Sequence, residues 1–112
     1  MPNQMAQLNL VFQALADPTR RAVVERLARG PTATSELAQP FKMALPSFLQ
    51  HMDVLQKCGL VLSRKSGRVR TYELTPNTLR EAEDWMASQR ALWERRLDQL
   101  DSFLEDLKEQ SE

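Results

Sequence analysis

The chain has 112 residues, 42% of them hydrophobic, and its 15 basic and 15 acidic side chains give a net charge of zero. This length allows one domain with a modest core, so we expect a single domain over residues 1–112. A single cysteine excludes an internal disulfide framework, and no segment has the length of a membrane span or the pattern of a secretory signal. We therefore expect a cytoplasmic protein without a membrane partner.

Helical periodicity dominates the first forty residues. Apolar residues repeat at helical spacing over residues 5–16, which predicts a first amphipathic helix. Asp17 and Pro18 then form a helix start signal, because Asp caps a helix N-terminus and Pro fits its first position. A Gly-Pro pair ends this second helix. We expect a short third helix over residues 35–38, capped by Thr32 or a near neighbour.

A fourth helix is predicted over residues 45–57. Its apolar residues recur at steps of three and four, so we expect one buried stripe made of Leu45, Phe48, Met52 and Leu55. The other faces of this helix carry Pro46, Ser47, Gln50, His51 and Val54.

A basic hairpin is predicted directly after this helix. Gly59 is a suitable left-handed C-terminal residue for the helix, and residues 61–74 contain two runs typical of strands, joined by a turn at Ser66 and Gly67. The net charge of zero hides a polarised distribution: residues 1–72 hold ten bases and four acids, a net charge of +6, which leaves −6 for residues 73–112. Between Lys57 and Tyr72 there are five bases and no acid, so the hairpin and the end of the preceding helix form a positive patch, for which phosphates are the natural partner.

A helix followed at once by a basic hairpin suits a DNA-binding unit, with the helix in the major groove and the hairpin on phosphates. The residues that we expect to contact double-stranded DNA are Pro46, Ser47, Gln50, His51, Val54, Arg64, Lys65, Arg68 and Arg70. Two alternatives stay open. His51 can be a half-buried helix residue without a role, and the bases can be a solvated edge that discourages strand aggregation.

The last predicted helix covers residues 77–108 and is long for a globular domain. Leucine, methionine and tryptophan recur in it at seven-residue intervals, which indicates a helix that packs against a partner helix. We expect a homodimer that forms through this helix and the helix over residues 5–16. The expected interface residues are Leu8, Val11, Phe12, Trp85, Met86, Trp93, Leu97, Leu100 and Leu104. The two tryptophans can also line an effector pocket, but core packing is the preferred interpretation.

Five short segments together resemble the ArsR/SmtB family of transcriptional repressors. They are residues 14–21 (ALADPTRR), 36–38 (ELA), 50–55 (QHMDVL), 59–61 (GLV) and 67–72 (GRVRTY). Each piece alone is weak, but they occur in order over about residues 8 to 75.

The resemblance implies a winged helix-turn-helix fold, which is mainly α with a small β-hairpin. The third helix and the helix over residues 45–57 would form the helix-turn-helix, and residues 61–74 the wing. The first and last helices would form the dimer. It also implies a regulator that binds promoter operator DNA. Metal-sensing branches carry cysteines near the third helix, or His and acidic ligands on the last helix. These ligands are absent here, so we expect no metal and no cofactor.

Other functions remain to be weighed. No constellation of nucleophile, base and orienting group is visible, so we do not expect an enzyme. The long last helix also allows a protein-interaction module on a winged-helix scaffold. The effector is unknown, and a small organic ligand, oxidation of the Cys58 thiol, or no effector at all are open. Cys58 is more simply interpreted as a small packed residue, and Arg21 as the partner of Glu25 in a structural ion pair.

Overall fold

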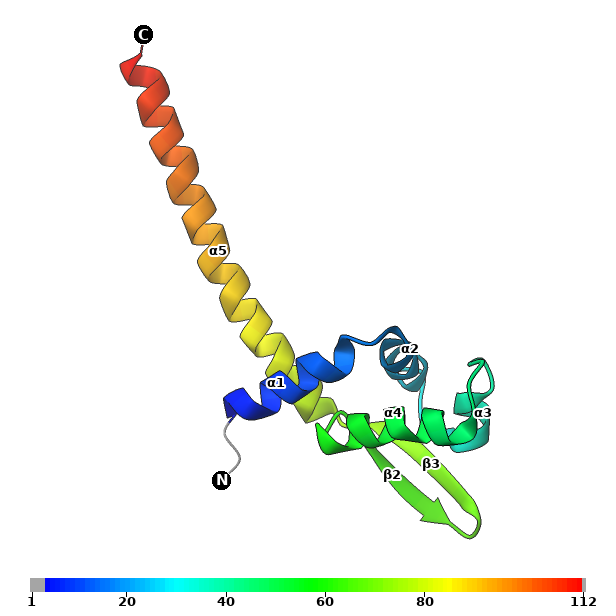
Figure 1. The fold of residues 1–112 in the computed structure, drawn as a ribbon. Coiled ribbons are helices and arrows are strands. Elements are labelled where there is room, and N and C mark those ends of the chain that lie inside the picture. Colours follow the sequence, from blue (N-terminus) through cyan, green and yellow to red (C-terminus); the bar gives the residue numbers. More distant parts are fainter. Residues whose placement is uncertain (1–3, 112) are drawn as a thin grey trace. The chain divides into compact units, whose positions relative to one another are not determined.

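The computed structural model describes residues 4–111 (Figure 1). In chain order the elements are α1 (Gln4–Leu15), α2 (Pro18–Leu27), β1 (Thr32–Ala33), α3 (Thr34–Ala38), α4 (Leu45–Lys57), β2 (Val61–Ser66), β3 (Val69–Leu74) and α5 (Pro76–Gln110). The five expected helices and the expected hairpin are therefore present, in the expected order. The chain separates into two compact units, the first ending at Arg80 and the second beginning at Glu81. The expected single domain stays a prediction.

Helix α2 begins as its sequence predicts. Asp17 is the N-cap residue, and its Oδ2 atom accepts a hydrogen bond of 3.0 Å from the backbone N–H of Arg20. Pro18 occupies the first position of the helix, where its missing N–H costs nothing. The start of α2, and with it the sharp turn after α1, is therefore fixed by local chemistry.

Two arginines in the first turn of α2 reach back to α1. The Nε atom of Arg20 donates to the carbonyl oxygen of Ala14 at 2.7 Å, and Nη1 of Arg21 donates to that of Leu15 at 2.8 Å. Positive groups are favourable at a helix C-terminus, where the last carbonyl groups lack partners in the helix. The predicted ion pair between Arg21 and Glu25 is therefore wrong, because the guanidinium of Arg21 caps the C-terminus of α1 instead.

The sheet has three antiparallel strands in the order β1–β3–β2, one strand more than expected. Strands β2 and β3 pair along their whole length, with Val61 opposite Leu74 and Ser66 opposite Val69. Gly67 lies in the connecting turn with a φ of 62°, a conformation that is easy only for a residue without Cβ. The predicted hairpin is confirmed, and its basic tip projects from the first unit (Figure 1).

Strand β1 was missed because it is only two residues long and forms by pairing with a distant partner. Thr32 lies opposite Tyr72 and Ala33 opposite Thr71. Of the predicted caps of α3, Thr32 or a near neighbour, Thr32 is wrong and the neighbour is found. The N-cap residue is Ala33, without a capping side chain, and the hydroxyl of Thr32 donates to the carbonyl of Gly30 at 3.1 Å.

The core of the first unit lies beneath α4. Phe48, Met52 and Leu55 are at most 1% exposed, and they form most of the predicted stripe. Leu45, however, is 54% exposed, so its predicted burial is wrong. The ring of Phe41, from the turn before α4, stacks on Phe48 with centroids 5.7 Å apart. Other buried residues come from α1, α2, α3, β2 and β3, and they include Val11, Ala14, Val23, Leu27, Leu37, Val61 and Tyr72.

Gly59 ends α4 in the left-handed conformation that its position predicts, with a φ of 84°. Its carbonyl oxygen accepts a hydrogen bond of 2.7 Å from the hydroxyl of Thr78. A Cβ atom added at Gly59 would lie 3.3 Å from that hydroxyl and from the side-chain amide of Gln7. The site therefore requires glycine both for the backbone conformation and for the close approach of its neighbours.

Helix α5 has 35 residues and is slightly longer than predicted. Most of it belongs to the second unit. In residues 4–111, no helix combines the length and the hydropathy that crossing a membrane would require.

Candidate nucleic-acid interface

Helices α3 and α4, with the turn between them, form a helix-turn-helix, and α4 lies beside the hairpin (Figure 1). Because α4 buries one stripe, its opposite side faces solvent. Four of the five α4 residues expected at DNA lie on this exposed side, namely Pro46, Ser47, Gln50 and Val54.

His51, the fifth, is placed differently. Its side chain is 23% exposed, and its Nδ1 atom lies 3.1 Å from Nη1 of Arg20 and 3.8 Å from Oδ2 of Asp17. One edge of the imidazole therefore faces the start of α2 and not the solvent. Sequence reasoning missed this contact because the two side chains are 31 positions apart and neither position carries a local signal for it.

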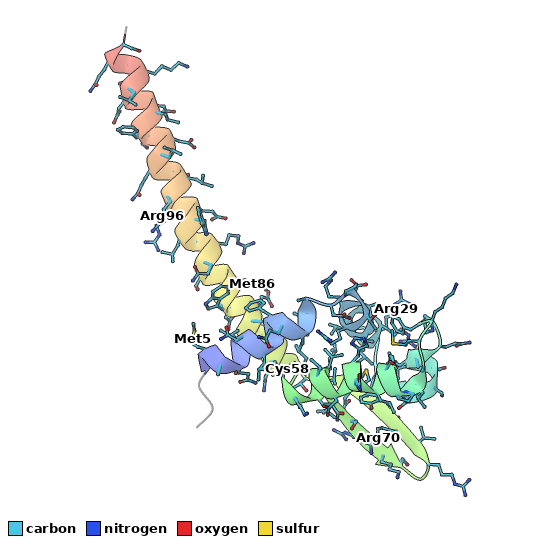
Figure 2. All side chains as sticks on the ribbon, viewed as in Figure 1. Met5, Arg29, Cys58, Arg70, Met86 and Arg96 are labelled. Carbon is cyan, nitrogen blue, oxygen red and sulfur yellow. The ribbon has the colours of Figure 1, made fainter. Side chains whose placement is uncertain are left out.

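Two of the four expected bases in the hairpin are held by neighbours. The Nε atom of Arg64 pairs with Oε1 of Glu73 at 2.9 Å across the two strands. Nη1 of Arg70, which lies on β3 (Figure 2), donates to the hydroxyl of Ser63 at 2.7 Å. These contacts orient the two guanidinium groups and leave part of each exposed, since an arginine has five N–H donors.

The other two bases are available for a ligand. Lys65 and Arg68 are exposed at the end of the hairpin, and within the described part of the chain their side chains make no ion pair or hydrogen bond. On α4, Lys57 pairs with Asp53 at 2.8 Å. The hydrogen bond to Asp53 raises the pKa of Lys57 above its usual value.

Cys58 follows α4 as a buried residue, 2% exposed, and its Sγ atom donates to the carbonyl oxygen of Leu55 at 3.3 Å. Burial raises the pKa of this thiol, which therefore stays protonated and weakly reactive at neutral pH. In the described residues, no three His, Cys, Asp or Glu side chains converge so that they could hold a metal ion.

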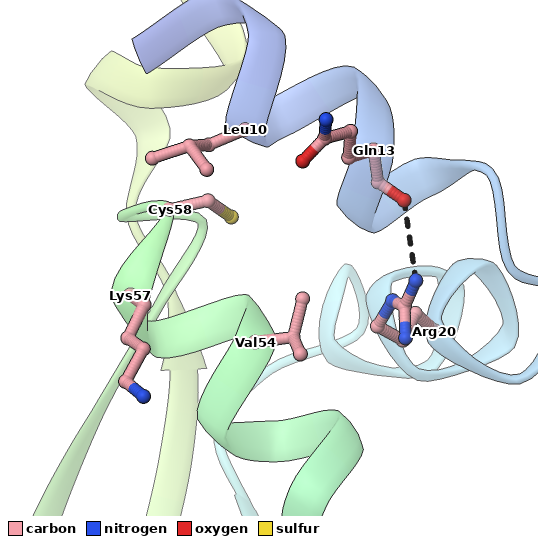
Figure 3. Close-up of a pocket in the computed structure, with 6 residues that line it drawn as sticks. All are labelled: Leu10, Gln13, Arg20, Val54, Lys57 and Cys58. Carbon is pink, nitrogen blue, oxygen red and sulfur yellow. Dashed lines mark hydrogen bonds between the residues drawn. The ribbon is translucent and has the colours of Figure 1, made fainter. Parts of the chain in front are cut away.

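A cavity of about 350 Å³ opens beside the sulfur atom (Figure 3). Helix α1 contributes Leu10 and Gln13, and α2 contributes Arg20, whose Nη2 atom donates to the carbonyl oxygen of Gln13 at 3.2 Å. The remaining wall is the end of α4, formed by Val54, Lys57 and Cys58. This cavity thus adjoins the C-terminal half of α4.

The expected interface residues of α1 differ in their exposure. Leu8 and Phe12 are half-buried, and Leu10, which was not predicted, is 47% exposed. Val11 is only 1% exposed within the single chain. Little of its side-chain surface is therefore left for a partner, and its place in the dimer interface stays a prediction.

Helix α5 carries a long row of exposed apolar side chains in the second unit (Figure 2). Trp93 is 62% exposed and Leu100 51% exposed. The other expected interface residues of this helix are also exposed, and they are Trp85, Met86, Leu97 and Leu104. Large apolar residues are rarely left in contact with water in such number, which marks this helix as an interaction surface.

Sequence comparison identifies the helix-turn-helix independently. A family model described as a helix-turn-helix domain matches residues 15–64. The chain is 50% identical over 68 residues to the HTH-type transcriptional regulator Rv2034 of Mycobacterium tuberculosis; the match covers 61% of the chain and 64% of that relative, less than two thirds of its length. It is 29% identical over 79 residues to the transcriptional repressor SdpR of Bacillus subtilis, covering 70% of the chain and 88% of that relative.

Solved structures extend the match to the fold. The homodimeric winged helix-turn-helix DNA-binding domain Mb0332 of Mycobacterium bovis is 26% identical, with a TM-score of 0.63 over 79% of the chain and 83% of that domain. The ArsR family transcriptional regulator RHA00566 is 52% identical, with a TM-score of 0.77 over 84% of the chain and 97% of that structure. At this identity and coverage, the chain belongs to the ArsR family and is a transcriptional regulator with a helix-turn-helix DNA-binding domain.

Proposed function

We propose that the chain is a repressor that binds an inverted-repeat operator as a homodimer and does so without a metal ion. Each protomer would lay α4 in a major groove and place the β2–β3 hairpin on the adjoining backbone. In helix-turn-helix dimers the two half-sites are about 34–36 Å apart, one turn of B-form DNA. The two-fold symmetry of the protein then requires an imperfect palindrome.

The observation that carries this proposal is the exposed side of α4 with the basic hairpin beside it. Ser47 and Gln50 offer a hydroxyl and an amide, which can exchange hydrogen bonds with base edges in the major groove. Pro46 and Val54 offer apolar contacts, for example to thymine methyl groups. These four residues would determine specificity.

The bases of the hairpin would supply affinity. Lys65 and Arg68 have no partner within residues 4–111, so they are the strongest candidates for phosphate contacts. Arg64 and Arg70 would contribute through the N–H groups that their neighbours leave exposed. Phosphate contacts fix the position of the protein on the duplex but do not distinguish base sequences.

The dimer would form through the exposed apolar row of α5 and the half-buried Leu8 and Phe12 of α1. A helix with nine large apolar side chains in water is costly for a monomer, and a second copy of the same chain removes this cost for both. The homodimeric state of the Mycobacterium bovis domain supports the formation of a homodimer. The proposed interface residues are Leu8, Phe12, Trp85, Met86, Trp93, Leu97, Leu100 and Leu104.

The chemistry of the available donors supports binding without a metal. The chain has one histidine and one cysteine, and transition-metal sites in proteins use several such groups. Here Nδ1 of His51 faces Arg20, and the Cys58 thiol is buried and protonated. Elemental analysis of the purified protein is the test: stoichiometric zinc or nickel would overturn this part of the proposal.

The DNA-binding part is tested by selection of random duplexes with the purified protein. We expect enrichment of one imperfect palindrome, and reporter expression from a promoter that carries it should fall when the protein is present. A protein that enriches no sequence at low ionic strength, but binds another protein in a salt-independent manner, would instead be an interaction module. Increased reporter expression would contradict the proposed repression but not the proposed DNA binding.

A further inference from the structure

One guanidinium group joins three helices of the first unit. Arg20, in the first turn of α2, donates through Nε to the carbonyl of Ala14 at 2.7 Å and through Nη2 to that of Gln13 at 3.2 Å. Both carbonyls belong to the last turn of α1. The same guanidinium places Nη1 3.1 Å from Nδ1 of His51, in the middle of α4 (the Gln13 contact is drawn in Figure 3).

The direction of the contact with His51 is fixed by the chemistry of arginine. A guanidinium only donates hydrogen bonds, so Nδ1 of His51 must accept, and the ring proton must lie on Nε2. Asp17 stands behind the pair, with its Oδ2 atom 3.8 Å from Nδ1. Its hydrogen bond with the backbone N–H of Arg20 lowers the pKa of the Asp17 carboxyl, so this group is charged at neutral pH and helps to hold the arginine.

Helix α4 has a second polar anchor on its other flank. The Nε2 atom of Gln56 donates to the hydroxyl of Ser63 on β2 at 2.9 Å. The apolar stripe of α4 alone would tolerate a small rotation, because burial is not directional. Hydrogen bonds are directional, and α4 has one on each flank: His51 to the start of α2, and Gln56 to the hairpin. Together they fix the rotation of α4 about its axis, and so the direction in which the exposed residues between them point.

We propose that Arg20 is a positioning residue for DNA specificity: through His51 it fixes the rotation of α4 and thereby aims Ser47 and Gln50 at the base edges. Ser47 lies one helical turn before His51, and Gln50 precedes His51 directly, so a rotation of α4 that displaces His51 also displaces both of these residues. The inference rests on the proposed role of α4 in the major groove. In this proposal His51 links α4 to Arg20, whereas its position on α4 had predicted a direct contact with DNA.

The test is a double-mutant cycle with operator selectivity as the readout. Selectivity is the ratio of affinities for the selected palindrome and for the same duplex changed at one base pair in each half-site. We expect Arg20→Gln and His51→Ala each to lower this ratio by roughly tenfold, which is within the range of one base contact. The double variant should be no worse than either single variant, because both remove the same restraint. If His51 contacts DNA independently, the losses will multiply, and the proposal is overturned.

Two further variants separate positioning from simple destabilisation. Arg21→Gln removes the neighbouring arginine, which caps the same helix α1 at Leu15 and has no contact with His51, so selectivity should stay as in the wild type. His51→Asn retains an acceptor for Arg20, because its Oδ1 atom takes the place of Nδ1, and it should recover most of the selectivity lost in His51→Ala. Failure of this rescue, with the variant folded by circular dichroism, would overturn the proposal even if Arg20→Gln does not fold. A wild-type protein that selects no DNA would instead refute the proposed function itself.

Discussion

Gln56 and Ser63 join α4 to the hairpin, with the side-chain amide of the first 2.9 Å from the hydroxyl of the second. The same hydroxyl accepts a hydrogen bond of 2.7 Å from Arg70 on β3. One serine thus connects the proposed base-contacting helix with the two strands that carry the proposed phosphate contacts. Substitutions on α4 therefore test specificity for the base sequence, and substitutions on the hairpin test affinity for the DNA backbone.

Replacement of Gln50 by Ala should relax specificity. The amide is on the exposed side of α4 and can make a bidentate contact with a base, so its loss should cost about 1–3 kcal/mol at one position of each half-site. Binding to the selected duplex and to single-base variants, followed by fluorescence anisotropy, measures this cost. Gln39→Ala, in the turn after α3, is the matched control and should leave the base preference unchanged. Equal loss of affinity for all sequences would contradict a base contact.

Replacement of Arg68 by Ala should weaken binding to every sequence alike. Loss of one phosphate contact reduces the release of counterions, so the slope of log affinity against log salt should become shallower by about 1. Arg29→Ala removes the same charge from the end of α2 (Figure 2) and should leave the slope unaltered. If the two variants behave identically, the hairpin contributes only net charge and not a located contact.

Replacement of Asp17 by Ala should lower stability by about 0.5–2 kcal/mol, because it removes the N-cap of α2. The folded state lowers the pKa of this carboxyl below its ordinary value of 3.8, chiefly through the hydrogen bond from Arg20. The contribution of the charge is therefore complete above pH 3.8 and is lost as the pH falls through the lower folded value. Urea unfolding from neutral pH downward should show the wild type and the variant converging in acid.

Asp17→Asn is the control for this prediction, because Asn also caps helices but does not titrate. It should retain most of the stability at neutral pH and lack the acid dependence that arises from Asp17. A variant Asp17→Ala as stable as the wild type at neutral pH would mean that the cap contributes nothing.

Replacement of Leu100 by Asp should produce monomers. The side chain is 51% exposed on the apolar row of α5, and a charge there would have to be buried in the proposed dimer. Analytical ultracentrifugation at micromolar concentration measures the change. Ser102→Asp places the same charge about 200° further round the helix and should leave the dimer intact. A wild-type protein that is already monomeric under these conditions would refute the dimer.

The Cys58 thiol should react slowly in the folded protein. It is 2% exposed, and burial raises its pKa, so little thiolate is present at neutral pH. Alkylation followed by mass spectrometry should become much faster when urea unfolds the chain. Fast alkylation of the native protein at neutral pH would instead favour regulation by thiol oxidation.

The elements were predictable where their signals are local. Helix α4 and the hairpin follow from apolar spacing, a helix-ending glycine and a turn, and all of these lie within thirty residues of one another. Strand β1 was not predictable, because two residues carry no periodicity and its pairing partner Tyr72 lies forty positions beyond Thr32. Leu45 fits the periodic stripe but is exposed, whereas Phe41, from the preceding turn, packs on Phe48.

The exposed residues of the site were predictable from the sequence, but the hydrogen bonds and ion pairs between them were not. The exposed side of α4 follows from the buried stripe, and this identified Ser47 and Gln50. The contact between Arg20 and His51 depends on how α2 packs beside α4, and the sequence contains no signal for this geometry. Likewise, only the strand register brings Arg64 to Glu73 and Arg70 to Ser63, and so distinguishes the held bases from Lys65 and Arg68.

The spacing of the two half-sites tests the central claim most directly. If a rigid dimer presents two copies of α4 to successive major grooves, binding depends on the distance and rotation between the half-sites. Insertion of about 5 base pairs at the centre of the selected palindrome turns the half-sites to opposite faces of the duplex, and affinity should fall to that of a single half-site. Affinity that is indifferent to this insertion would contradict a dimer that reads DNA through two coupled helices.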